Sequence, residues 1–175
     1  MKTKLTLFTL LIFLFFAGCK DGNITFYVND SVETTLKTGS PINLPFNIPI
    51  GNVSSSKSTE FKNNNTTPDL IKTVVLEELT ATITNPADED FSFIKSIHIF
   101  IMKSYDTEKK EIAYLDDISS TAQKISLICT DENLVPYLQD STYKLDTQYT
   151  IKEYPGHDID LRLDLKFKVG ASVLK

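Results

Sequence analysis

The sequence predicts an all-β protein, an antiparallel β-sandwich of immunoglobulin-like or related Greek-key topology with about eight or nine strands. One observation is the strict alternation of apolar and charged residues over 161–169. A second is the spacing of the short apolar runs, which follow one another at intervals of roughly 10 to 15 residues with turn residues between them. A third is that no segment keeps the apolar period of a helix for three turns.

The clearest predicted strand covers 161–169, where every odd position is apolar and every even position is charged. A period of two places one face of a strand in the core and the other in water. A second strand is predicted over 72–84, because its last apolar residues alternate with threonines. The polar sequence 85–90 then breaks the alternation and predicts a turn.

Four further strands are predicted on the same criteria. The segment 94–102 is more apolar than the others, which indicates a central strand. A polar turn at 106–110 leads into a strand at 111–115. The remaining two predicted strands cover 124–129 and 143–152.

The segment 41–50 predicts an edge strand in spite of its prolines. Its apolar residues fall on even positions and are expected to face inward, while Pro41, Pro45 and Pro49 fall on odd positions. Residues two apart in a strand point their N–H groups to the same side, so all the missing donors would lie along one edge. Prolines there also discourage edge-to-edge association. The alternative is a polyproline-like arm packed on the surface.

One short helix is predicted near 131–139. Thr130 is suited to cap it, acidic residues occupy its first turn, and Pro136 limits it to one or two turns. The segment 52–68 is rich in serine, asparagine and threonine, which predicts a long mobile polar loop. Taken together, these elements predict a single β-sandwich domain over 24–175.

The first 18 residues predict a signal peptide. Lys2 and Lys4 precede an apolar run from Leu5 to Ala17. This run is shorter than the roughly 20 apolar residues that a membrane-spanning helix needs. We therefore expect residues 1–18 to be removed from the mature protein.

The residues after this apolar run predict a lipid anchor. Ala17 and Gly18 directly precede Cys19, a sequence that resembles the lipobox of bacterial lipoproteins. The resemblance implies that the Cys19 thiol takes a diacylglyceryl group, that the chain is cut before Cys19, and that the new amino group is acylated. Several acyl chains make a stable anchor at about 0.8 kcal/mol per buried methylene. Residues 19–23 would form the lipidated tether. The alternatives are a plain signal peptide with a chance cysteine, or a buried core helix.

Four segments of the mature chain carry a second resemblance. The segments 75–86, 91–101, 110–114 and 134–138, in this order, are similar to a group of uncharacterised Bacteroidota lipoproteins with an all-β domain. The charged stretch 20–23 also looks like the export signals of surface-displayed lipoproteins in that phylum, with a solvated tether as the alternative. The resemblance implies export and lipid anchoring at the bacterial outer membrane, and it leaves open whether the domain faces the periplasm or the cell surface.

Charge and cysteine content exclude several classes of protein. The chain has 18 basic and 23 acidic residues. An acidic surface repels phosphate backbones and anionic head groups, so we expect no nucleic-acid partner, and membrane attachment must come from the lipid. Cys129 is the only thiol left once Cys19 is modified, so no intrachain disulfide is expected. An antibody-type immunoglobulin domain is excluded, because the chain also lacks tryptophan.

The sequence announces no nucleophilic or phosphate-binding site. It lacks a G-x-S-x-G motif and a glycine-rich phosphate loop. Alternation places Cys129 on the apolar side of its strand, which predicts a buried and inert thiol. His98 lies between two isoleucines, which indicates a half-exposed or hydrogen-bonded strand histidine rather than a ligand.

Metal ligands are similarly sparse in the sequence. His157, Asp158 and Asp160 stand together, but no second cluster accompanies them. The acidic turns 88–90 and 116–117 lack the spacing of a calcium loop. We therefore predict no catalytic residue, no metal and no cofactor.

The sequence-based hypothesis for function is a membrane-anchored accessory lipoprotein that presents a β-sandwich for protein–protein interaction in the bacterial cell envelope, without catalytic activity. The alternative is a surface carbohydrate-binding module, because sandwiches commonly bind sugars through exposed aromatic residues. The carbohydrate-binding hypothesis predicts that several tyrosines share one exposed face, whereas the accessory-lipoprotein hypothesis does not require this. The candidate residues for glycan binding are Tyr105, Tyr114, Tyr137, Tyr143, Tyr149 and Tyr154.

Overall fold

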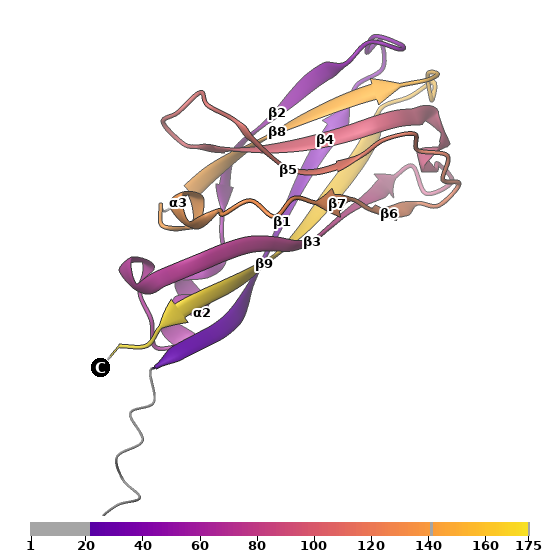
Figure 1. Ribbon diagram of the computed structural model, residues 1–175. Coiled ribbons are helices and arrows are strands. Elements are labelled where there is room, and N and C mark those ends of the chain that lie inside the picture. The colour runs from indigo at the N-terminus through magenta and orange to yellow at the C-terminus, as the bar shows by residue number, and fades with distance from the viewer. Residues whose placement is uncertain (1–21, 141, 175) are drawn as a thin grey trace, which may run out of the picture.

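The computed structural model describes residues 22–140 and 142–174 of the chain. Two antiparallel β-sheets pack face to face over these residues, so the predicted all-β sandwich is confirmed (Figure 1). The predicted signal peptide, residues 1–18, and the predicted lipidation site, Cys19, lie outside the described residues.

Nine strands of the described chain form the two sheets, in the orders β1-β9-β3-β6 and β2-β8-β4-β5-β7. The strands of the first sheet are β1 (Asn23–Leu36), β9 (Ile159–Ser172), β3 (Ile71–Asn85) and β6 (Lys124–Ser126). Those of the second sheet are β2 (Phe46–Ser54), β8 (Thr142–Ile151), β4 (Ile94–Lys103), β5 (Lys110–Leu115) and β7 (Ile128–Cys129). The predicted strands 72–84, 94–102, 111–115 and 143–152 correspond to β3, β4, β5 and β8, and β4 is central as predicted.

The strand order is that of a jelly roll, a double sheet built from two Greek keys. Strands β1 to β4 alternate between the two sheets, and the last strand, β9, returns to pair between β1 and β3. In an immunoglobulin domain the first two strands lie side by side in one sheet. In this chain β1 and β2 lie in different sheets, so the Greek-key alternative is the one present.

Strand β9 is the predicted alternating strand, and it extends beyond 161–169 at both ends. Its apolar residues, from Ile159 to Ala171, are buried, while its charged residues lie on the outer face of the first sheet. It pairs along its whole length with β1 and along most of it with β3. The sequence pattern did not predict strand β1.

The predicted strand 124–129 is wrong as a single element, because the chain crosses there from one sheet to the other. Strand β6 pairs with β3, whereas β7 pairs with β5 in the second sheet. Between them, the Leu127 N–H donates to the carbonyl oxygen of Leu79 at 2.9 Å. Alternation alone does not show this change of partner, since Ile125 and Leu127 are buried on both sides of it.

The short helix predicted near 131–139 is present with about one turn, within the predicted one or two, but it starts later than expected. Helix α3 covers Val135–Leu138, and Leu134 precedes it in place of the predicted cap. Thr130 is used elsewhere, because its N–H and its hydroxyl donate to the carbonyl oxygens of Ile112 and Glu111 in β5. Pro136 falls in the first turn, where a helix does not need its N–H.

The segment 52–68, predicted as a long mobile polar loop, contains regular structure. Strand β2 continues to Ser54, helix α2 covers Lys57–Asn63, and a 3-10 turn, η2, covers Pro68–Leu70. Phe61 of α2 is buried and packs edge-on against Phe26 of β1, with ring centroids 5.9 Å apart. The hydroxyl of the buried Thr66 donates to the carbonyl oxygen of Ser172 at 2.6 Å. One aromatic residue and one buried hydroxyl thus hold a mostly polar segment against the core.

The prediction for 41–50 holds in part. Strand β2 is an edge strand of the second sheet, as predicted, and Pro49 lies within it. The strand begins only at Phe46, however, and Leu44 is 63% exposed rather than facing inward. Ile42 keeps a single bridge to Ile151.

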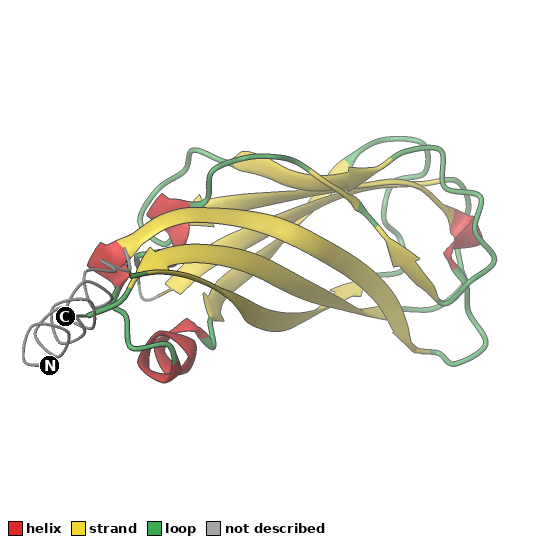
Figure 2. Cartoon of the chain, turned by 60° about the horizontal axis from the view of Figure 1, so that its bottom comes forward, coloured by secondary structure: helices red, strands yellow, loops and turns green. Residues whose placement is uncertain are grey.

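The register of the strands defines two ends of the sandwich. Asn23 pairs with Ser172 at one end, and Leu36 pairs with Ile159 at the other. We call the first the α2 end, because Gly22, Leu174 and α2 lie there; Figure 2 shows the C-terminus and this helix together. We call the second the loop end, which consists of the connections 37–45, 86–93, 116–123 and 152–158. The short turn η3 (Phe91–Phe93) belongs to it.

We expect Phe61→Ala to lower the free energy of unfolding by about 3 to 5 kcal/mol, because it opens a cavity between α2 and β1. Urea unfolding followed by circular dichroism measures this change. The matched control is Leu44→Ala on the exposed loop, for which a change within about 0.5 kcal/mol is expected. Equal and small changes in both variants would show that α2 is not part of the cooperative core.

Candidate functional site

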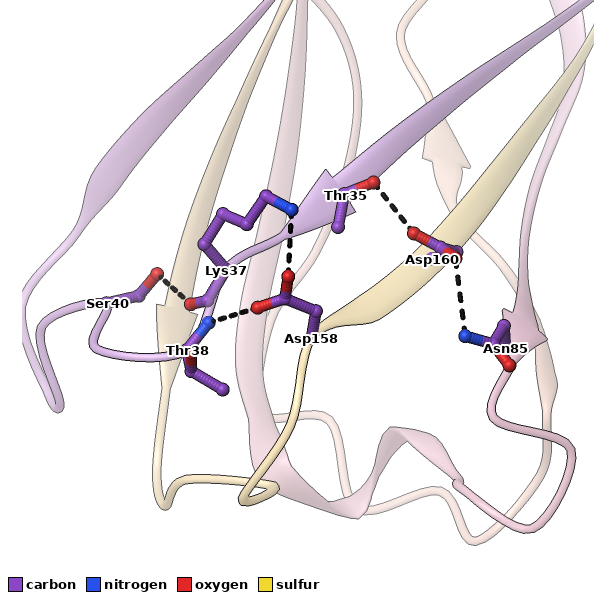
Figure 3. A network of polar contacts seen from close by, with 7 residues as sticks. All are labelled: Thr35, Lys37, Thr38, Ser40, Asn85, Asp158 and Asp160. Atoms are coloured by element: carbon purple, nitrogen blue, oxygen red, sulfur yellow. Dashed lines mark hydrogen bonds and ion pairs between the residues drawn. The ribbon is translucent and has the colours of Figure 1, made fainter.

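The loop end is held together by a hydrogen-bond network that joins its first and last loops. The Asp158 carboxylate accepts a hydrogen bond from the Thr38 N–H at 2.9 Å and one from the Lys37 ammonium at 2.8 Å (Figure 3). Ser40 closes the turn of the first loop by donating to the carbonyl oxygen of Lys37. Gly39 makes this turn feasible, since its φ of 85° lies in the left-handed region.

The same contacts set the charge state of the pair. The hydrogen bonds from Lys37 and from the Thr38 N–H hold the pKa of Asp158 below its ordinary value. In return, Asp158 raises the pKa of Lys37. Both groups are exposed, so water and salt screen the pair and its contribution to stability is small. Its effect is to fix the position of one loop against the other.

Asp160 makes a second junction, next to the first. Its carboxylate accepts hydrogen bonds from the Thr35 hydroxyl of β1 at 2.7 Å and from the Asn85 amide of β3 at 3.4 Å (Figure 3). The Thr84 hydroxyl donates to the backbone carbonyl of the same residue. The start of β9 is therefore tied to the ends of both its neighbouring strands.

The remaining loops are joined through Lys152. Its N–H donates to the Phe93 carbonyl at 2.8 Å, and its ammonium donates to the carbonyl oxygen of Ile118. The Phe91 N–H in turn donates to the carbonyl oxygen of Ala122. All four loops of the loop end thus form one connected surface.

This connected surface exposes two large apolar side chains. Leu44 is 63% exposed and Tyr154 is 49% exposed. Single exposed apolar side chains also occur on ordinary protein surfaces, so these two are candidate contact points and not a continuous apolar patch.

The loop end is also acidic. Apart from His157, its only basic residues are Lys37 and Lys152. A surface of this charge attracts a basic partner and repels an acidic one. The acidic residues of its four loops are Asp88, Glu89, Asp90, Asp116, Asp117, Glu153 and Asp158.

The three potential metal ligands found in the sequence do not converge. His157 lies 3.1 Å from the Glu89 carboxylate, whereas Asp158 and Asp160 take part in the two junctions described above. Within residues 22–140 and 142–174, no group of three or more His, Cys, Asp or Glu side chains is placed to hold a metal ion. The acidic turns make local contacts instead. For example, the Asp90 carboxylate accepts a hydrogen bond from the Ser92 N–H.

His98 is a half-buried, hydrogen-bonded strand histidine, as the sequence predicts. Its Nδ1 lies 2.6 Å from a Glu111 oxygen, and its Nε2 lies 3.2 Å from an Asp116 oxygen. The ring stacks on Tyr114. The two carboxylates lie on opposite sides of the ring, so they do not share a point at which a ligand could be bound by all three.

Cys129 is half-buried rather than fully buried, because it lies in the two-residue strand β7 at the edge of its sheet. Burial still raises the pKa of its thiol. A raised pKa lowers the fraction of thiolate, the reactive form of the side chain.

The candidate tyrosines do not form one exposed face. Tyr143 and Tyr149 are buried in the core. Tyr105 is 76% exposed after β4, at the α2 end, while Tyr154 lies at the loop end. Tyr114 and Tyr137 are half-buried. Sequence reasoning missed Tyr27, which is 40% exposed on β1 with the Lys166 ammonium 4.7 Å above its ring.

A buried lysine that the sequence did not reveal lies at the α2 end. Lys57 is only 5% exposed, and its ammonium donates to the backbone carbonyl of Asp140. Burial lowers the pKa of Lys57, and the carboxylates of Asp30 and Asp140 oppose this effect. The Asp30 carboxylate itself accepts hydrogen bonds from the Ser56 N–H and the Tyr143 hydroxyl. These groups attach the start of α2 to both sheets.

A cavity of about 480 Å³ lies beside Lys57. Phe61 and Pro68 contribute to its wall, together with threonine and lysine side chains of the same segment. No sequence signal indicated it, because the cavity forms only when α2 and η2 fold back onto the sandwich. Two of its polar residues, Lys57 and Thr66, already hold that segment in place, whereas one buried carboxylate oxygen of Asp140 has no hydrogen-bond partner among the described residues.

No protein-family model and no curated protein matches the chain. Among solved structures, the chain is similar to the BFDV capsid protein at 9% identity and a TM-score of 0.44, covering 86% of this chain and 94% of that one. The Desmodium yellow mottle tymovirus structure matches at 13% identity and a TM-score of 0.35, covering 88% of this chain and 92% of that one. The FLHE structure matches at 10% identity and a TM-score of 0.37, covering 85% of this chain and 97% of that one. These superpositions are partial, so the jelly-roll assignment depends on the strand order alone.

We expect the Asp158 carboxyl to titrate below its ordinary value of 3.8 in the folded protein. A depressed pKa means that the contact with Lys37 stabilises the fold above the unfolded-state pKa, and that this contribution is lost as the pH falls through the folded-state pKa. Carboxyl ¹³C NMR measures the midpoint. In Lys37→Met the midpoint should rise towards 3.8, while that of Asp90, which depends on Ser92, should stay unchanged. An unchanged Asp158 midpoint would show that the junction is absent in solution.

Proposed function

We propose that the protein is a lipid-anchored accessory lipoprotein of the bacterial cell envelope, which holds its loop end away from the membrane to bind a protein partner. The role is one of binding, without catalysis and without a cofactor. One observation carries the proposal: Gly22, from which the chain leads back to Cys19, lies at the opposite end of the sandwich from the four connected loops.

The short tether makes the orientation specific. Gly22 lies three positions after Cys19, and three extended residues span at most about 11 Å. A lipid on Cys19 would therefore keep the α2 end near the bilayer. Strand β1 runs from this end for 14 residues, about 45 Å, towards the loop end. The loops would thus be displayed well clear of the lipid head groups.

In this proposal the anchor is the lipid on Cys19. Within the described part of the chain, no helix is both long enough and apolar enough to cross a bilayer. The acidic composition also gives no electrostatic attraction to anionic lipids. Acylation of Cys19 would supply an anchor of several chains, which is stable where a single chain is not.

The surface of the loop end suits a protein partner better than a glycan. A sugar-binding platform needs aromatic rings side by side, and the two most exposed tyrosines of the candidate set lie at opposite ends. The loop end instead combines separate apolar side chains with an acidic rim and fixed loops. This combination resembles the anatomy of transient protein interfaces, in which apolar anchors are surrounded by polar residues.

We expect Cys19→Ser to release the protein from the outer-membrane fraction, because the acylated side chain is lost. Fractionation and immunoblotting measure this. Cys129→Ser is the matched control and should leave the protein in the membrane. A Cys19→Ser protein that still sediments with membranes would contradict the anchor.

We expect the double variant Leu44→Ser/Tyr154→Ser to lose its partner, because both exposed apolar groups of the loop end are removed. The protein is purified from gently solubilised outer membranes, and proteins that accompany it in stoichiometric amounts are quantified by mass spectrometry. Tyr105→Ser, at a more exposed site at the α2 end, should keep the partner. A monomer without any stoichiometric partner in the wild type would overturn the proposed function.

A further inference from the structure

We propose that the part of β1 nearest the loop end, Ser31 to Thr35, accepts an extended segment of a partner protein as an added β-strand. In this mode of recognition, main-chain hydrogen bonds provide affinity and alternate side chains provide specificity. The inference rests on the proposed function, because it states how the protein partner of the anchored domain docks. Strand β1 is suited to the role because it is an edge strand whose only neighbour in the first sheet is β9.

The outward backbone groups of β1 are largely free. The Val173 N–H donates to the Gly22 carbonyl, so the even residues of β1 face β9 and the odd residues face away from it. Among the described residues, one hydrogen bond reaches these outward groups, from the Ser56 hydroxyl to the Asn29 carbonyl. Ser31, Glu33 and Thr35 therefore present N–H and C=O groups that an added strand can pair with.

The other edges of the two sheets are protected against such pairing. Strand β2 carries Pro49 and an irregularity between Ile50 and Asn52. Strands β6 and β7 have only three and two residues. By contrast, β1 has 14 residues in unbroken register with β9 and contains no proline, glycine, lysine or arginine. A long, regular edge without these features is a template for strand addition.

The core is incompletely covered beside this stretch of β1. Helix α2 covers the half of the strand near the α2 end, through Phe61 and Ser56. Further along, Val32 of β1 and Ile48 and Ile50 of β2 are only half-buried against the core. Strands β1 and β2 are the contacting edges of the facing sheets. Apolar side chains of an added strand would cover these residues.

The tether of the proposed anchored form cannot fill this position. Ser31 lies nine positions after Gly22 along the extended strand, a distance of about 30 Å, while the tether from Cys19 spans at most about 11 Å. The last described residue, Leu174, lies at the α2 end, where its N–H donates to the Asn65 carbonyl. We therefore assign the position to a segment of another molecule.

Charge distinguishes a partner protein from a second copy. Antiparallel pairing of two such stretches about their centre would place one Glu33 directly opposite the other, which is destabilising. Glu33 has no ion-pair partner among the described residues, because its cross-strand neighbour Arg162 directs its Nε to Asp164. A segment with a lysine or arginine opposite Glu33, flanked by apolar residues that face Val32 and β2, satisfies both requirements.

The test is site-specific cross-linking in the native, membrane-bound protein. A photoreactive amino acid replaces Ser31, and the cross-linked peptides are identified by mass spectrometry. We expect one extended segment of one other protein, containing a basic residue and alternating apolar residues. A second photoreactive position, Tyr154, reports on partner binding at the loop end independently.

Two proline variants separate strand addition from general damage. Within the described part of the chain, no acceptor pairs with the outward N–H groups of Glu33 and Thr25, so proline at either position should leave the thermal unfolding midpoint similar. Glu33→Pro removes the donor that an added strand needs and should lower the Ser31 cross-link about tenfold. Thr25→Pro, in the half of β1 that α2 covers, should keep the cross-link at the wild-type level.

Each outcome decides the proposal. Cross-links from Ser31 to another protein that are lost only in Glu33→Pro would support it. Cross-links from Ser31 to a second copy of the chain would overturn it in favour of self-association. A partner captured from Tyr154 but not from Ser31, or one indifferent to Glu33→Pro, would overturn strand addition while the proposed function stands. No partner from either position would overturn both.

Discussion

The structure depends on the pairing of its last strand, β9, between β1 and β3. Strand β9 lies 123 residues from the end of β1 in sequence, yet it supplies the hydrogen-bond partner for both neighbours across the first sheet. Its inward face also joins the two sheets, as in Phe167, which packs edge-on against Tyr143 at 6.1 Å. The sandwich cannot close until this strand is in place, because β1 and β3 have no other long partner in that sheet.

Closing the sandwich in this way creates two ends with different properties. At the α2 end, the buried Lys57 and the Asp30 carboxylate fix a helix against both sheets. At the loop end, Asp158 and Asp160, one on each side of the start of β9, tie the adjacent loops and strand ends together. Binding surfaces are commonly carried by loops that a rigid scaffold positions, and the loop end has this character. The fold itself does not specify a partner, since one architecture serves many functions.

The edge strands of the two sheets show how far the local sequence predicts which strands lie at an edge. Pro49 marks β2 as an edge strand because it lacks a donor, and this was readable from the sequence. The open edge of β1 could not be read from the sequence. The side-chain pattern around Thr25, Tyr27 and Val28 would be the same in an edge strand as in an inner strand. β1 is an edge strand because β9 pairs with it on one side and no strand of the described chain pairs with it on the other. The network of the loop end was hidden for the same reason: Lys37 and Asp158 are 121 residues apart in sequence.

The sequence by itself determined the all-β class, the long alternating strand and the turns between strands, because these follow from the period of apolar residues and from local backbone preferences. It also carries the lipobox-like residues before Cys19, on which the expected anchor depends. Tertiary structure decided the jelly-roll order, the crossing between β6 and β7, and the folding of 57–63 as a helix. In each of these cases the deciding contact joins distant segments, as Phe61 joins Phe26 and Leu127 joins Leu79. A local sequence pattern indicates which residues will be buried in the core. The residue that each of them packs against is decided by how the two sheets assemble.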